Sequence, residues 1–252
     1  MPYDVVDNKL VCKNDFRKID DYVENKLKIK EKASRLFVDL GNLGNIIIIG
    51  GAVRDIVIND TEPRDIDIIV DTDEEIDYVI KAYDNVHKNR FGGFKLFIDE
   101  LEFDIWSTRN HWAFKENILN KSISNIKYST FLNFDSIFYN LTTKEGEAEL
   151  FNNCIANSYL DFTLNKNDIY KNPSKDTNIL RMLIIKDQWS LNFSDNVKKY
   201  IEEWCNSSIN SNELVENLLI AQRKHYRNRT KISKQRICFR LREFMNIGID
   251  VE

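Results

Sequence analysis

The sequence predicts an α+β protein in two parts, a mixed sheet with helices followed by an all-helical segment. Two apolar runs, residues 46–49 and 66–70, resemble buried strands on either side of a glycine pair, and residues 94–105 alternate like a β-hairpin. Beyond about residue 115 the apolar spacing becomes helical. We expect a first domain at residues 1–145 and a helical second domain at 146–252.

Composition is that of an ordinary globular protein. Of the 252 residues, 42% are hydrophobic and 30% are charged, and the net charge of −4 argues against a globally basic nucleic-acid binder. No apolar run approaches the ~20 residues of a membrane helix, and the first residues lack the apolar core of a signal peptide. The four cysteines form no CxxC pair, so we expect a reducing compartment and a soluble, cytoplasmic protein without a membrane partner.

The elements of the first part begin with a predicted helix over residues 14–40, where apolar residues recur at helical spacing after an Asn-Asp pair that can cap the start. Four isoleucines at 46–49 follow, and their β-branched side chains favour a buried strand. The residues just past the glycine pair are typical of the first turns of a helix. Residues 66–70 form the second predicted strand.

The later elements are predicted from spacing in the same way. An apolar stripe after a Thr-Asp start predicts a helix over residues 72–86. The hairpin has its turn near Asp99–Glu100, with Phe94, Leu96 and Ile98 sharing one face of its first strand. Three segments give the clearest helical pattern in the second part: residues 179–189, 195–204 and 212–226.

Asp65 and Asp67 stand two residues apart in the second strand, so their side chains share one face. Carboxylates this close repel each other and raise each other's pKa unless a cation lies between them. A hard divalent ion bound by the two carboxylates would offset this repulsion. Two such ions can stabilise the attacking and leaving oxygens of a displacement at phosphorus. The alternative is a solvent-facing strand with Arg64 as an ion-pair partner.

Gly50 and Gly51 lie between a strand and a helix start, where backbone amides can approach an anion. Arg54 in the first turn of that helix and Arg64 beside the carboxylates can pair with phosphate oxygens. The alternative for the glycines is a simple tight turn.

Asp104 is the expected third carboxylate. It lies on the return strand of the hairpin between Phe103 and Ile105, so its side chain faces away from theirs. The alternative is a polar-face residue of an amphipathic hairpin.

These motifs together resemble a known family. Residues 50–70, GGAVRDIVINDTEPRDIDIIV, are similar to the head-domain motif of the tRNA nucleotidyltransferases and bacterial poly(A) polymerases, a branch of the DNA polymerase beta superfamily. The hairpin at 90–109, the segment 136–140 and the Leu180-Arg181 pair resemble later family motifs, the last in its neck helix. The resemblance covers roughly residues 40–205.

The resemblance implies a polymerase-beta-like head, a helical neck, and template-independent transfer of nucleotides from an NTP to an RNA 3′-end, that of a tRNA or another RNA. Asp65, Asp67 and Asp104 would be catalytic and hold two Mg²⁺ ions, with Mn²⁺ as an alternative. The triphosphate would lie on Gly50–Gly51 with help from Arg54 and Arg64, and Arg181 would line the base side.

The family's base-reading element is not preserved, because Lys175, Asp176 and Asn178 stand in its region. Two alternatives to an RNA-tailing enzyme therefore stay open. One is a toxin or defence-type transferase that modifies tRNA or another acceptor. The other is a nucleotide-binding regulatory module without turnover.

A basic run at residues 222–243 is the second notable feature. Its cationic residues could follow a nucleic-acid backbone, with Tyr226 and Phe239 stacking on bases. Equally, the run could be a solvated face that neutralises acidic neighbours. The residues assigned to RNA binding are Arg223, Lys224, Arg227, Arg229, Lys231, Lys234 and Arg236.

Overall fold

The computed structural model describes residues 10–89, 92–172, 174–208, 210–226 and 231–245. The chain divides into two compact units, Lys9–Asn153 and a second that contains Cys154–Glu252. The assignment of head and neck functions to residues 1–145 and 146–252 stays a prediction. No helix among the described residues combines the length and the apolar character needed to cross a bilayer.

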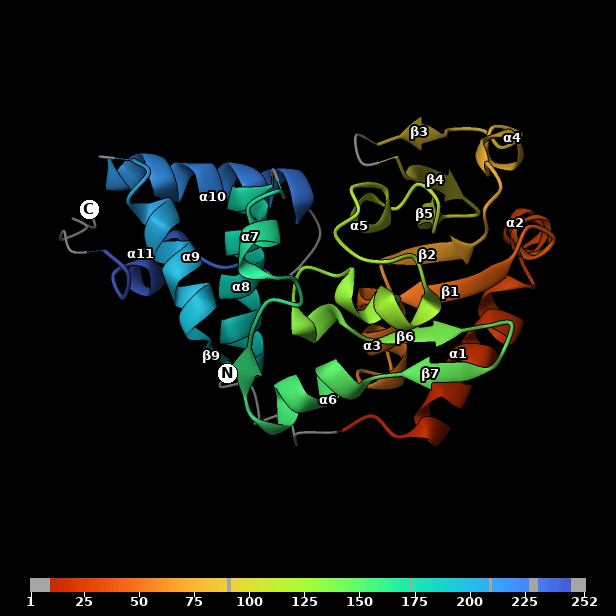
Figure 1. Cartoon of the computed structure of the whole chain (residues 1–252), viewed down its shortest axis with the longest axis horizontal. Coiled ribbons are helices and arrows are strands. Elements are labelled where there is room, and N and C mark those ends of the chain that lie inside the picture. Colours follow the sequence, from red (N-terminus) through yellow and green to blue (C-terminus); the bar gives the residue numbers. More distant parts are fainter. Residues whose placement is uncertain (1–9, 90–91, 173, 209, 227–230, 246–252) are drawn as a thin grey trace. The chain divides into compact units, whose positions relative to one another are not determined.

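The first unit is built on a seven-stranded sheet in the order β3-β4-β5-β2-β1-β6-β7, in which only β2 and β5 are parallel (Figure 1). The strands are β1 (Asn45–Ile49), β2 (Asp65–Asp71), β3 (His87–Lys88), β4 (Phe94–Ile98), β5 (Leu101–Ser107), β6 (Phe138–Asn140) and β7 (Glu145–Glu147). The two strands and the hairpin expected from the sequence are confirmed. The expectation that the chain is helical from about residue 115 is wrong, since β6 and β7 extend the sheet beside β1.

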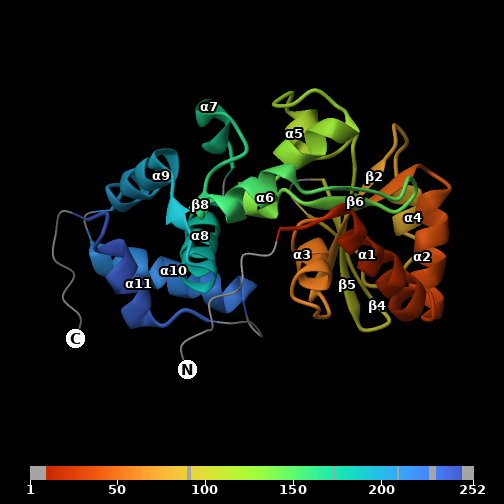
Figure 2. The same cartoon turned by 90° about the horizontal axis from the view of Figure 1, so that it is seen from below.

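Helices cover both faces of this sheet. The helices described up to the boundary between the units, which lies within α6, are η1 (Lys13–Phe16), α1 (Arg17–Tyr22), η2 (Val23–Leu27), α2 (Glu31–Gly41), α3 (Gly51–Val57), α4 (Asp77–Ile80), α5 (Trp112–Lys115), η3 (Ile123–Tyr128), η4 (Asn133–Asp135) and α6 (Glu149–Ala156). Helices α1, α2 and α3 lie on one face and α5 lies on the other (Figure 2). Because both faces are covered, all four isoleucines of β1 are buried.

Two predicted helices differ from the structure. The helix expected over 14–40 is interrupted at residues 28–30, and α2 starts afresh at Glu31. Its start is capped from far along the chain, since the Ala33 amide donates to Asp99 Oδ2 at 2.9 Å. The helix expected over 72–86 is only the short α4.

The second unit is mainly helical, with α7 (Lys166–Ile169), α8 (Lys175–Trp189), α9 (Asp195–Cys205), α10 (Ser211–His225) and α11 (Lys234–Leu241). A two-stranded parallel sheet joins β8 (Tyr159–Leu160) to β9 (Asn192–Phe193), so the expectation of an all-helical second domain needs that small correction. The Gln222 side chain of α10 donates to the Ile232 carbonyl and accepts from the Ile232 amide, so Ile232 is tied to that helix.

Candidate active site

The candidate site lies where β2 and β5 begin. These strands are parallel, with Asp65 opposite Glu102 and Asp67 opposite Asp104. Residues directly opposite on neighbouring strands point to the same side of a sheet, so all four carboxylates share one face. Sequence reasoning placed three of these acids on that face, and the structure adds Glu102.

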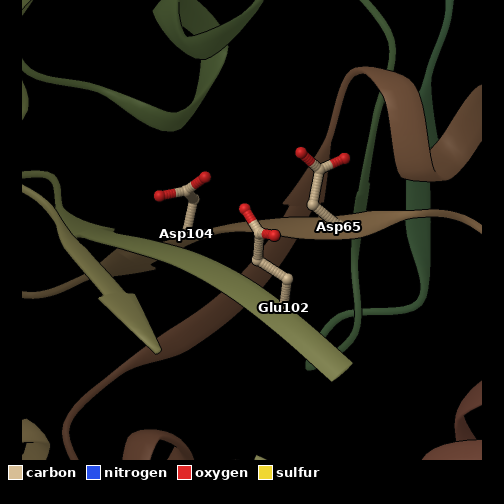
Figure 3. A group of neighbouring side chains, drawn as sticks. All are labelled: Asp65, Glu102 and Asp104. Atoms are coloured by element: carbon tan, nitrogen blue, oxygen red, sulfur yellow. The ribbon is translucent and has the colours of Figure 1, made fainter. Parts of the chain in front are cut away.

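The carboxylates of Asp65, Glu102 and Asp104 converge (Figure 3). One oxygen from each lies within 4.8 Å of the others. Two charges at such a separation repel by about 3 kcal/mol at an effective dielectric constant of ~20. Asp67 is outside this set of three, and its role as a metal ligand stays a prediction.

Two cationic side chains offset part of this repulsion. The Lys95 ammonium of β4 lies 3.1 Å from Asp104 Oδ2 and also pairs with Glu102, while Arg64 pairs with Asp65. Burial raises the pKa of Asp104 above its ordinary value, as do the charges of Asp65 and Glu102, although Lys95 opposes the shift. Burial would lower the pKa of Lys95, but its bond to Glu102 and the charge of Asp104 raise it.

This donor set fits a hard divalent cation. Mg²⁺ and Mn²⁺ prefer carboxylate oxygens, and oxygens on opposite sides of one octahedral ion lie about 4 Å apart. The observed upper limit of 4.8 Å therefore needs only a small side-chain adjustment. All three residues are partly exposed, so water and phosphate oxygens can complete the coordination.

The glycine pair lies where β1 passes into α3. Gly50 has φ +73° and ψ −124°, a backbone conformation that other residues rarely adopt. A Cβ at Gly50 would meet only Asp135 O at 3.8 Å, so the backbone angle, not crowding, requires the glycine. The Gly50 amide donates to Ile137 O at 2.7 Å, and that amide is therefore engaged within the fold.

Arg54 contacts protein groups in this structure. Its guanidinium lies 3.0 Å from Asp135 Oδ1, donates to the Phe134 carbonyl, and stacks 4.3 Å from the centre of the Phe134 ring. Arg54 thus fastens α3 to the segment before β6, and its contact with a triphosphate stays a prediction.

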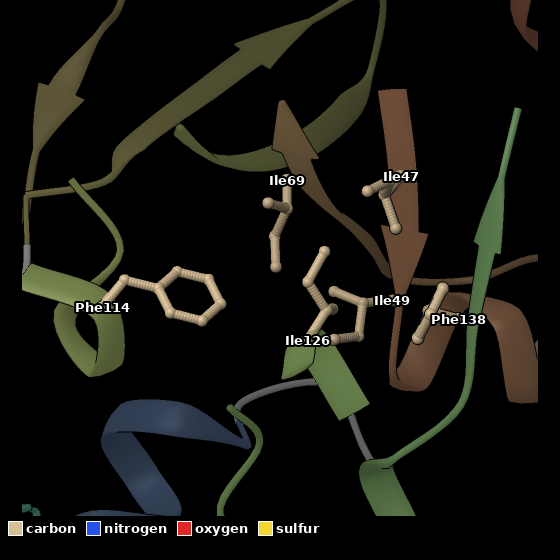
Figure 4. Packing of buried hydrophobic residues seen from close by; sticks show 6 residues of the cluster. All are labelled: Ile47, Ile49, Ile69, Phe114, Ile126 and Phe138. Carbon is tan, nitrogen blue, oxygen red and sulfur yellow. The ribbon is translucent and has the colours of Figure 1, made fainter. Parts of the chain in front are cut away.

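An apolar cluster lies on the same face of the sheet as the acids (Figure 4). In β2 the series Asp65, Asp67 and Ile69 passes from partly exposed carboxylates to a fully buried side chain. The cluster consists of Ile47, Ile49, Ile69, Phe114, Ile126 and Phe138. The acids therefore lie at the partly exposed starts of β2 and β5, beside this cluster.

Trp106 lies two residues beyond Asp104 on the same face of β5. A Cβ on Gly93 would come within 2.0 Å of Trp106 Nε1, so the indole lies directly against the glycine backbone. The Trp106 ring also meets His111 edge to face, at 6.4 Å between centroids.

The remaining predicted residues lie in the second unit. Arg181 is on α8 and is partly buried. Arg223, Lys224, Lys231 and Lys234 are exposed, whereas Arg227 and Arg229 lie outside the described residues. Arg236 instead pairs with Asp187 through two hydrogen bonds of 2.8 and 3.1 Å.

Glu102 and Lys95 are the two site residues that sequence reasoning missed. Glu102 carries a usable signal, since it stands two residues before Asp104 and must share its face. Lys95 becomes visible only when the hairpin register pairs it with Asp104.

The fold is similar to those of several solved structures, although the sequence itself has no detectable match. No family model and no curated protein matches the sequence. The CCA-adding enzyme of Thermotoga maritima, solved with tRNA, matches with a TM-score of 0.56 and 18% identity over 87% of this chain and 53% of that chain. A CCA-adding enzyme solved with ATP matches with a TM-score of 0.57 and 16% identity over 87% and 54% of the two chains.

A tRNA nucleotidyltransferase solved with a primer tRNA and an incoming ATP analogue gives a TM-score of 0.55 and 16% identity over 83% of this chain and 59% of that chain. This chain thus spans little more than half the length of these structures. It has the mixed-sheet and helical fold that these enzymes share, as the sequence resemblance implied.

Proposed function

We propose that this protein is a template-independent nucleotidyltransferase that adds nucleotides from an NTP to an RNA 3′-end, that of a tRNA or another RNA. The observation that carries the proposal is the convergence of Asp65, Glu102 and Asp104 at the partly exposed starts of β2 and β5. Its setting supports the reaction class, since the fold is shared with enzymes solved with tRNA and ATP.

In the proposed reaction the RNA 3′-oxygen forms a bond to the α-phosphorus, the bond to the bridging oxygen breaks, and pyrophosphate leaves. The 3′-hydroxyl proton passes to solvent. Divalent ions, Mg²⁺ or Mn²⁺, supply charge neutralisation and lower the pKa of the hydroxyl when bound. Asp65, Glu102 and Asp104 would hold them, with Asp67 as a further ligand on the same face.

The chain's other groups have positioning roles in this proposal. Arg64 lies beside Asp65 with a partly exposed side chain, so it can turn toward the triphosphate. The Gly50–Gly51 turn and Arg54 are proposed to border the same phosphates. The assignment of Arg181 to the base rests on the sequence resemblance, and a cytoplasmic location is proposed from the cysteine pattern and the apolar runs of the sequence.

The test uses purified protein, total RNA, Mg²⁺ and each α-labelled nucleoside triphosphate in turn. We expect label transfer to RNA that chelation of Mg²⁺ abolishes and that Asp65→Asn reduces by at least about a hundredfold. Asp71→Asn is the matched control, because Asp71 lies on the same strand at its opposite end. Undiminished transfer by Asp65→Asn would refute the proposal.

A second candidate is a nucleotide-binding regulatory module. It is favoured by the internal pairing of Arg54 with Asp135 and of Lys95 with the acids, which a protein without turnover could keep permanently. Nucleotide binding without label transfer to any RNA would support this alternative. Sequencing RNA 3′-ends after expression of the wild type and of Asp65→Asn distinguishes a general tailing enzyme from a toxin or defence-type transferase, which would modify a narrow set of acceptors.

A further inference from the structure

Lys95 lies among the carboxylates of the candidate site. It is directly opposite Asp104 in the β4–β5 pair. Its ammonium lies 3.1 Å from Asp104 Oδ2 and contacts Glu102 as well. The Lys95 side chain is 44% exposed, whereas that of Asp104 is 14% exposed. The lysine therefore reaches into the cluster from its solvent side.

The formal charges show what Lys95 achieves there. Asp65, Asp67, Glu102 and Asp104 bring four negative charges to one end of the face. Lys95 and Arg64 bring two positive charges, each in contact with at least one of these acids. Two net negative charges remain with Lys95 in place, and three when its ammonium is withdrawn.

We infer that Lys95 is a resident counter-cation of the carboxylate cluster, and that a divalent ion must displace its ammonium from Glu102 and Asp104 to bind. This inference rests on the proposed function, since it concerns the same site. The Lys95 ammonium contacts Glu102 Oε1 and Asp104 Oδ2, so the lysine and a divalent ion are like charges that compete for the same two carboxylates. A lysine suits this role, because its flexible stem lets the partly exposed ammonium move into solvent.

Displacement gives Glu102 a role as well. With Lys95 withdrawn, Glu102 presents a free carboxylate beside Asp65, its partner across the parallel strands. Glu102 then joins Asp65 and Asp104 as an ion ligand. Lys95 is thus a positioning residue that sets ion affinity, and it keeps the like charges together when the ion is absent.

The test is a Mn²⁺ titration followed by electron paramagnetic resonance, without nucleotide or RNA. We expect Lys95→Met to bind Mn²⁺ roughly three- to tenfold more tightly than the wild type, because a competing cation is lost. Lys95→Arg keeps the charge and should restore weaker binding. Lys88→Met is the matched control, since Lys88 pairs with Asp77 at 2.9 Å and is 50% exposed on the neighbouring strand. Its affinity should equal that of the wild type.

A gain in affinity is a result that simple loss of structure does not produce. Equal or weaker Mn²⁺ binding by Lys95→Met would overturn the inference and leave the proposed function standing. Adding Glu102→Gln to Lys95→Met should lower the affinity by at least about tenfold, and unchanged binding would exclude Glu102 as a ligand. Absence of Mn²⁺ binding in the wild type and all variants would overturn both proposals.

Discussion

The guanidinium of Arg54 and the carboxylate of Asp135 form an ion pair of 3.0 Å in which both side chains are nearly buried, at 11% and 12% exposure. The pair joins the helix that follows the glycine turn to the segment before β6. Because a buried charge without its partner is costly, we expect Asp135→Ala to lower the free energy of unfolding by about 3 kcal/mol. Urea denaturation measures this change.

Glu62→Ala serves as the control for that measurement. It breaks an ion pair with Lys26 in the same unit, but the two side chains are 70% and 58% exposed. A loss below about 1 kcal/mol is expected there. Similar losses for the two variants would contradict the structural role assigned to Arg54.

The closeness of Gly93 to Trp106 predicts an effect on the site face. An alanine Cβ at position 93 would lie 2.0 Å from Trp106 Nε1, so the indole must move. We expect Gly93→Ala to cost about 2 kcal/mol of stability and to shift the tryptophan fluorescence. Gly41→Ala is the control, since its Cβ would meet only Ile46 Cδ1 at 3.7 Å within α2. That change should stabilise the protein by about 0.5 kcal/mol.

His111 predicts a pH dependence of stability. Burial lowers the pKa of His111 to about 4. The unfolded chain, with an ordinary pKa near 6.5, binds a proton first as the pH falls, so stability from this residue is present above pH 6.5 and lost toward pH 4. The total loss is about 3 kcal/mol. His111→Asn, which can still cap α5, should lack this loss in denaturation curves between pH 7 and 4, whereas His87→Asn on exposed β3 should keep it.

The environment of Asp104 predicts that removing its charge makes the folded protein more stable but removes its activity. Since burial and neighbouring acids raise its pKa, the charged form is disfavoured in the folded protein. The neutral isostere Asp104→Asn should therefore raise the free energy of unfolding in ion-free buffer and abolish nucleotide transfer. A lower melting temperature without divalent ions would show that the Lys95 contact outweighs the repulsion.

The basic run predicts a separable RNA contact. Lys231 and Lys234 are exposed, so replacing both by alanine should weaken RNA binding and reduce its salt slope by about 1.5. The matched control is Lys198→Ala with Lys199→Ala, two half-exposed lysines on α9 of the same unit. Equal salt slopes for the two double variants would favour the charge-neutralising interpretation of the run.

Local sequence patterns correctly predicted those elements whose structure is determined by residues near one another in the sequence. The isoleucines of β1 and the alternation of the hairpin gave correct strands because β-branching and period two are read within a few residues. The helix expected over residues 14–40 was wrong for a non-local reason. The start of α2 depends on Asp99, 66 residues along the chain, and no nearby residue signals it.

The part of the candidate site that depends only on the alternation of side chains along a strand could be predicted from the sequence. Alternation alone placed the side chains of Asp65 and Asp67 on one face of the strand. It also placed the Asp104 side chain on the face opposite to those of its apolar neighbours. It could not supply the parallel pairing of β2 with β5, which brings Glu102 beside Asp65. Nor could it show that Arg54 faces Asp135, because that contact spans 81 residues.

The two-residue turn at Asp99 and Glu100 joins the strands that carry Lys95 and Asp104. Both residues have positive φ, at 50° and 66°, and Asp99 is fastened to α2 through Ala33 and Lys30. The turn therefore determines which side chains of β5 point to each face of the sheet. One residue inserted into the strand after Glu100 would turn every later side chain of β5 to the opposite face of the sheet. Glu102 and Asp104 would then point into the apolar core on that face. Two inserted residues would keep the present facing of Glu102 and Asp104, as would one residue accommodated in a β-bulge.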